Sequence, residues 1–133
     1  MNARMFALVF GVVYLLVGLL GFTASATMAD ARLLGLFPVN LMHNLVHIAI
    51  GAWGLLSYRS LTGAVTYARG LAIVYALLTI LGIIPATNRL FGLAPLYGHD
   101  IWLHALTAAI AAYFGWMAPA ERGGTINASR RRI

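Results

Sequence analysis

Residues 32–47 read RLLGLFPVNLMHNLVH, and residues 89–104 read RLFGLAPLYGHDIWLH. The two segments align without a gap at a distance of 57 residues, with an arginine, a proline and a final histidine at equivalent positions. These three residue types are scarce in the chain, so the match is specific. Self-similarity at a fixed distance indicates a repeated structural unit. The sequence therefore predicts two copies of one loop that leads into an apolar helix.

The composition indicates a membrane protein. The 133 residues are 62% hydrophobic and 9% charged, with a mean hydropathy of +0.87, whereas a soluble domain carries roughly a quarter charged residues. The chain has no cysteine, which excludes disulfides and thiolate metal sites. Its net charge of +6 comes from arginines near the ends of apolar stretches and in the tail, which predicts membrane topology and no nucleic-acid partner. The expected partner is the lipid bilayer, and a homo-oligomer is left open.

Four apolar stretches are predicted to cross the membrane as helices, because about 20 apolar residues suffice for one crossing. Glycine and proline mark the ends of the third and fourth stretches. The basic segment after the fourth is expected to be a disordered cytoplasmic tail. The predicted spans are residues 5–23, 39–58, 64–84 and 98–118, in a transmembrane domain of residues 1–119 followed by a tail of residues 120–133.

The first stretch has one competing interpretation, a signal peptide cleaved after residues 27–29. Its apolar run is longer than the roughly 7–15 apolar residues of a signal peptide. Tyr14 and Gly21 in this run also recur with the same spacing as Tyr75 and Gly82 in the third stretch. We therefore interpret the first stretch as a transmembrane helix.

The arginines are distributed unevenly between the two predicted sides of the membrane. Seven fall on one side, and only Arg32 and Arg89 fall on the other. By the positive-inside rule both termini are cytoplasmic, and all four histidines face outward. Two hairpins of two spans each would be parallel repeats about an axis normal to the membrane, with the second and fourth spans facing each other. The predicted fold class is all-α, an integral membrane four-helix bundle built from two parallel-related helical-hairpin repeats.

The repeat places four ionisable side chains at matching positions. Residues four apart share one face of a helix, which pairs His43 with His47 and Asp100 with His104. Ionisable residues inside a spanning segment indicate a functional site. Three imidazoles and one carboxylate are a suitable ligand set for a transition metal such as zinc, iron or copper, with Asn44 as an outer hydrogen-bond partner. The leading hypothesis is a metal site on the outward side.

Two alternatives are left open. His47 and His104 could be opposed axial ligands of haem b in a redox protein. Alternatively, the histidine, asparagine and aspartate side chains only hydrogen-bond across helices and fix their packing, with Asp100 capping its helix. His99 lies off the shared face and is excluded from each set. No phosphate loop or nucleophile motif is present, so the sequence leans away from an enzyme.

The HNxxH motif of residues 43–47 and the DxWLH motif of residues 100–104 add a family resemblance. With the rest of residues 5–117, they make the chain resemble the bacterial four-helix membrane proteins of domain-of-unknown-function family 4383. The resemblance implies a four-span protein of the bacterial inner membrane. It supplies no activity.

Overall fold

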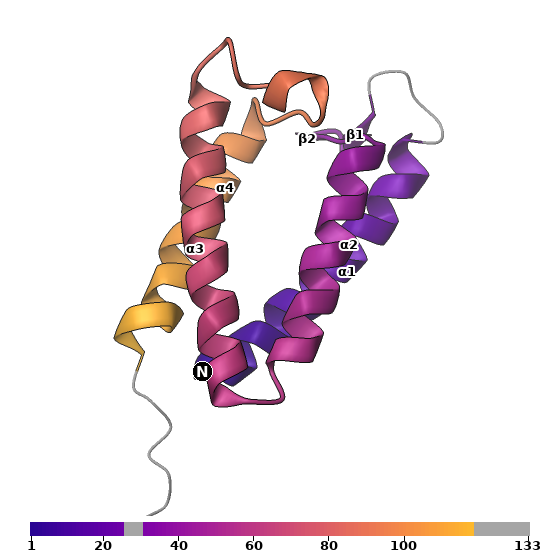
Figure 1. Ribbon diagram of the computed structural model, residues 1–133. Coiled ribbons are helices and arrows are strands. Elements are labelled where there is room, and N and C mark those ends of the chain that lie inside the picture. The colour runs from indigo at the N-terminus through magenta and orange to yellow at the C-terminus, as the bar shows by residue number, and fades with distance from the viewer. Residues whose placement is uncertain (26–30, 119–133) are drawn as a thin grey trace, which may run out of the picture.

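The computed structural model describes residues 1–25 and 31–118, which form four α-helices joined by turns and loops (Figure 1). The all-α class is therefore confirmed, and the two strands are only two residues long. The predicted tail of residues 120–133 lies outside the described residues. In chain order the elements are α1 (Ala3–Ser25), β1 (Arg32–Leu33), β2 (Phe37–Pro38), α2 (Leu41–Ser57), α3 (Leu61–Ile83), the 3-10 helix η1 (Leu90–Gly92), α4 (His99–Ala112) and the π-helical turn η2 (Tyr113–Met117).

The helices occupy the predicted spans to within a few residues. Two of their starts are fixed by side-chain caps, since the Asn40 side chain accepts a hydrogen bond from the His43 N–H and the Ser60 hydroxyl accepts one from the Gly63 N–H. α1 and α3 are long and apolar enough to cross a membrane, whereas α2 is a shorter apolar helix. The four membrane crossings themselves stay a prediction.

The four helices are arranged as two hairpins. α1 packs along α2, and α3 packs along α4. Figure 1 shows the hairpins close together near the N-terminus and the α2–α3 turn, and farther apart at the opposite end. Broad contact between the hairpins is made by α3 with α1 and α2, not by α2 with α4. The second and fourth helices were expected to meet or to face each other near the centre. Broad direct contact between them is not found, because α1 and α3 contribute the central aromatic residues.

Glycines allow α1 and α2 to approach closely. A Cβ atom on Gly51 would lie 2.6 Å from the backbone nitrogen of Leu15, and one on Gly54 would lie 2.8 Å from the Cα of Gly11. Backbone-to-backbone contact of this kind is typical of packed membrane helices. It sets the direction in which α2 presents its polar face.

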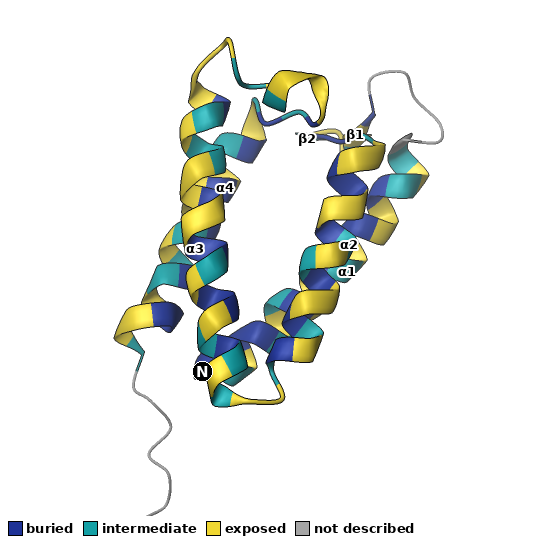
Figure 2. Ribbon diagram, viewed as in Figure 1, coloured by how far each residue is buried: buried dark blue, intermediate teal, exposed yellow. Residues whose placement is uncertain are grey.

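Figure 2 shows buried residues on the inward helix faces and exposed residues over the outer faces. Many of the exposed residues are large and apolar. On α1 and α3 they include Leu16, Leu19, Leu20, Ile73, Leu77 and Ile80, each more than half exposed. The outer surface of these helices is therefore apolar.

The two loops that precede α2 and α4 share a local backbone conformation. Leu34 and Phe91 lie 57 residues apart and both adopt a positive φ, of 55° and 56°. The glycines that follow them, Gly35 and Gly92, also have positive φ. Three backbone N–H to carbonyl hydrogen bonds of the first loop recur 57 residues later in the second. In the first loop they run from Gly35 to Arg32, from Leu36 to Leu33 and from Val39 to Ala31. In the second they run from Gly92 to Arg89, from Leu93 to Leu90 and from Leu96 to Asn88.

The glycine contact between α1 and α2 leads to a stability prediction. Gly51→Val should lower the free energy of unfolding by about 1–3 kcal/mol, because the added atoms meet backbone that cannot move aside. Ala52→Val is the matched control, since Ala52 is the exposed neighbour of Gly51. Unfolding in detergent, followed by circular dichroism, measures both variants. Equal stability of the two would contradict the close contact.

Candidate functional site

His43 and His47 lie on one face of the first two turns of α2. Asn40 fixes the start of this helix, because its side-chain oxygen accepts a hydrogen bond from the His43 N–H at 2.8 Å. The spacing of four residues then places one imidazole above the other. Their ring centroids are 4.5 Å apart, and both side chains are buried.

Asp100 and His104 occupy the corresponding turns of α4 and are 2% and 3% exposed. Gly98 begins this helix with a φ of 71°, a conformation that suits glycine. No side chain caps the helix here, so Asp100 does not have the capping role considered for it, although its place in the first turn suits the other role considered, a favourable interaction with the helix dipole. Its carboxylate is instead buried near Tyr75.

Two tyrosines belong to the same group, although the sequence analysis did not assign them to the site. Tyr14 stands edge-on to His47 with ring centroids 5.3 Å apart, and Tyr75 stands edge-on to His104 at 5.0 Å. The two tyrosine rings lie 5.7 Å from each other, with their hydroxyl groups within hydrogen-bonding reach. Their recurrence at matching positions of the first and third stretches was the available signal.

The group lines one cavity of about 280 Å³ that is walled by parts of both hairpins. Most of its wall is apolar and comes from α1, α4 and the loop that holds β1 and β2. Apolar walls with a few convergent polar groups are typical of ligand sites. Its polar side consists of Tyr14, His43, His47, Tyr75, Asp100, His104 and Thr107, of which Thr107 was also missed from the sequence.

Four polar atoms of this group have no hydrogen-bond partner in the part of the chain that the structure describes. They are the Nδ1 atoms of His43, His47 and His104, and Oδ2 of Asp100. Buried polar atoms are almost always paired with protein or water, and an unpaired one costs about 1–3 kcal/mol. These four atoms are therefore available to hydrogen-bond a water molecule or a ligand.

The four predicted metal ligands line this cavity together, with His43 and His47 on one hairpin and Asp100 and His104 on the other. Among residues 1–25 and 31–118, however, no group of three or more histidine or acidic side chains is arranged to hold a metal ion. Metal binding would require side chains of the two hairpins to move toward one ion. The metal site stays a prediction.

The haem alternative gains no support from the ring contacts. Haem with two axial histidines lies between both imidazoles. Here a tyrosine ring already packs against each of His47 and His104, and the two tyrosines contact each other. A macrocycle between these histidines would have to displace that pair.

Two polar residues near the cavity do not line it. Asn44 is fully buried and faces α1, where a Cβ atom on Gly21 would collide with its side-chain oxygen. This position favours a role in the α1–α2 contact over the predicted role as an outer partner of a metal ligand. His99, which the sequence analysis excluded, is exposed, and its Nδ1 accepts a hydrogen bond from Trp102 Nε1 at 3.0 Å.

Comparison with known proteins gives one match. The model of a family described as "Domain of unknown function (DUF4383)" matches residues 4–117. This match covers most of the chain and confirms the resemblance inferred from the two histidine motifs. No curated protein and no solved structure matches the chain.

The unpartnered imidazoles lead to a prediction about stability. His47→Leu and His104→Leu should leave the thermal midpoint unchanged or raise it by a few degrees, because removing an unpaired buried polar group gains about 1–3 kcal/mol, more than the about 0.5–1.5 kcal/mol lost with the contact to a tyrosine ring. Thermal unfolding in detergent measures this, with His99→Leu as the exposed control. A drop of more than about 5 °C in both variants but not in the control would favour the packing alternative.

Proposed function

The chain belongs to the DUF4383 family, whose description assigns no activity. We propose that this member is a four-span membrane protein that binds a small, largely apolar molecule. The binding site is the cavity between the hairpins. The observation that carries the proposal is the set of four unpartnered polar atoms on one side of an otherwise apolar cavity.

The apolar outer surface supports the membrane location. α1 and α3 each pass the length and hydropathy requirement for a membrane span. α2 has 17 residues, and α4 with the π-helical turn continues from His99 to Met117. At about 1.5 Å per residue, helices of 17–19 residues approach the roughly 30 Å of the hydrocarbon core. The large apolar side chains on their outer faces would contact lipid.

The matched loops and ring contacts support two parallel hairpin repeats. The positive φ values, the three hydrogen-bond pairs and the tyrosine–histidine contacts all recur at equivalent positions. Parallel repeats place equivalent residues at equal depth. His47 and His104 would then lie at one level, in the outward half of the bilayer.

Orientation follows from the arginines. Both termini and the α2–α3 turn would face the cytoplasm of a bacterial cell, and the loops before α2 and α4 would face outward. In the inner membrane this places the end that carries these two loops on the periplasmic side. The cavity would be reached from that side or from the lipid.

This topology can be tested with single cysteines, since the natural chain has none. Ala86→Cys should react with a membrane-impermeant maleimide in intact cells or spheroplasts, because Ala86 is exposed in an outward loop. Thr62→Cys, at the exposed start of α3, should react only after permeabilisation. Equal labelling of both positions in intact cells would contradict the proposed orientation.

The cavity walls define the kind of ligand. A volume of about 280 Å³ is near the lower end of the roughly 300–1,000 Å³ found for small-molecule sites. An imidazole nitrogen either donates or accepts a hydrogen bond, and a carboxyl group offers a further acceptor or donor. A ligand with an apolar body and a hydrogen-bonding head, such as an alcohol, a phenol or a quinone, fits these walls.

The ligand should accompany the purified protein. Solvent extraction followed by mass spectrometry should find a compound in wild-type protein and in His99→Leu, and at least tenfold less of it in His47→Leu and His104→Leu. The histidine on the exposed face controls for a general effect of losing an imidazole. A compound that is retained equally by all four proteins, or found in none of them, would contradict the proposal.

A transition metal is the second candidate, favoured by the three unpartnered imidazole nitrogens. Elemental analysis of the same four preparations decides it, because a bound ion would be stoichiometric in the wild-type protein and lost with either cavity histidine. An absorption spectrum of these samples also decides the haem alternative.

A further inference from the structure

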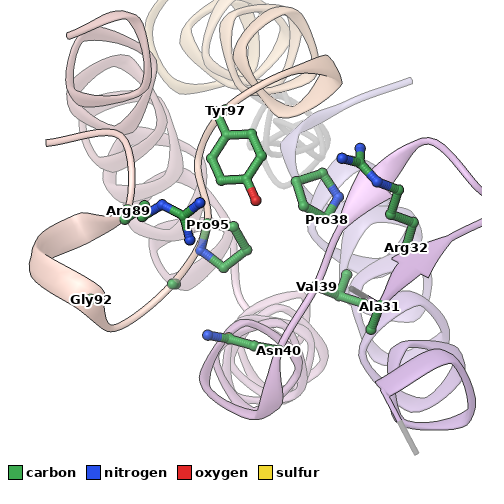
Figure 3. A pocket seen from close by; sticks show the side chains of 10 residues that line it. Ala31, Arg32, Pro38, Val39, Asn40, Arg89, Gly92, Pro95 and Tyr97 are labelled. Atoms are coloured by element: carbon green, nitrogen blue, oxygen red, sulfur yellow. The ribbon is translucent and has the colours of Figure 1, made fainter. Parts of the chain in front are cut away.

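A second pocket, of about 180 Å³, lies among the loops that precede α2 and α4. Both loops supply an arginine to it, Arg32 from β1 and Arg89 from the segment before η1. Figure 3 shows the two guanidinium groups on either side of Pro38, Pro95 and Tyr97. The two arginines are 57 residues apart, so the pocket combines equivalent parts of the repeated segment.

The described chain provides no acidic side chain to neutralise this pocket. Asp100 is the single carboxylate within residues 1–25 and 31–118, and it lines the other cavity. No ion pair of Arg32 or Arg89 is found among these residues. Two positive charges therefore share one small pocket, an arrangement that favours an anion.

Two contacts stabilise the pocket without using the hydrogen-bond donors of the guanidinium groups. The Asn40 amide donates to the Leu93 carbonyl at 2.9 Å and so joins the first loop to the second. The Arg89 guanidinium lies over the Tyr97 ring, 5.3 Å from its centroid. Stacking on an aromatic face leaves the in-plane N–H groups of an arginine free to donate.

We propose that Arg32 and Arg89 bind a phosphate group in this pocket. The planar guanidinium fork matches two phosphate oxygens, and a tetrahedral anion can accept from two forks at once. The pocket's size suits one phosphate group with its nearest substituent. The Tyr97 hydroxyl, which also lines the pocket, offers a neutral donor beside the charged ones.

Two exposed side chains of the loops that form the pocket favour a lipid headgroup as the source of the phosphate. Leu34 and Phe91 occupy equivalent positions in the two loops and are 80% and 79% exposed. Both are held at positive φ, which residues other than glycine adopt rarely and which clusters at functional segments. Large apolar side chains at a membrane interface enter the lipid and would bring the arginines to headgroup level. This source rests on the proposed membrane location, whereas phosphate binding itself does not.

The test compares three probes on protein purified in a neutral detergent: a short-chain phosphatidylglycerol, a phosphatidylglycerol-sized neutral diacylglycerol and inorganic phosphate. Native mass spectrometry and thermal shift measure binding. The Arg32→Gln/Arg89→Gln double variant should bind phosphatidylglycerol at least tenfold more weakly than the wild type. Arg32→Lys/Arg89→Lys should be intermediate, because lysine retains the charge but lacks the fork. Arg59→Gln, which removes an exposed arginine at the opposite end, should stay within twofold.

The binding results distinguish a lipid headgroup from free phosphate as the source of the phosphate group. Arginine-dependent binding of the anionic lipid, with weak or no binding of phosphate, supports the headgroup. Arginine-dependent binding of inorganic phosphate alone supports a free phosphate and remains informative even if the membrane topology is contradicted. Binding that is unchanged in the double variant, equally weakened in Arg59→Gln, or equal for the neutral lipid would overturn the proposal. Circular dichroism confirms that the exposed substitutions leave the helices intact.

Discussion

The contact between the rings of Tyr14 and Tyr75 determines how the two hairpins present their histidines. Each ring touches the other tyrosine and also stands edge-on to the histidine of its own hairpin. Aromatic contacts of this kind contribute about 0.5–1.5 kcal/mol each beyond the burial of surface. Because both tyrosines are buried, His47 and His104 have little freedom to turn away from the cavity. The polar side of the cavity therefore depends on four rings that pack as one series.

The cavity combines features that oppose each other energetically. Its apolar wall favours compaction, whereas its unpaired imidazole and carboxylate atoms disfavour burial. Two other contacts stabilise the fold despite these unpaired atoms. They are the close glycine contact between α1 and α2 and the stacked rings of Phe6 and Phe114. Much of the buried hydrophobic core lies at the starts of α1 and α3 and near the end of α4, whereas the unpaired polar groups lie toward the other end of the bundle. A binding site is more easily maintained at the less tightly packed end.

Much of the fold could be predicted from the sequence, because hydropathy, proline and glycine determine where apolar helices begin and end. That His47 and His104 line one cavity was also predictable, since they occupy equivalent positions in the two aligned segments. The tyrosines could not be assigned to the site, because a tyrosine in an apolar stretch is equally expected in packing. Which helices make contact between the hairpins could not be predicted, since a two-fold repeat allows either α1 with α3 or α2 with α4. The left-handed backbone at Leu34 and Phe91 was likewise hidden, because it contradicts the ordinary preference of these residues.

Asp100 occupies the position in the second aligned segment that is equivalent to His43 in the first. This difference affects how a molecule would lie in the cavity. Two identical hairpins would offer a ligand two orientations of equal free energy, related by a half-turn. With an imidazole at one position and a carboxyl group at the other, the two orientations differ in the hydrogen bonds they can form. An asymmetric molecule bound in this cavity would therefore have one preferred orientation, whereas two identical hairpins would give it none.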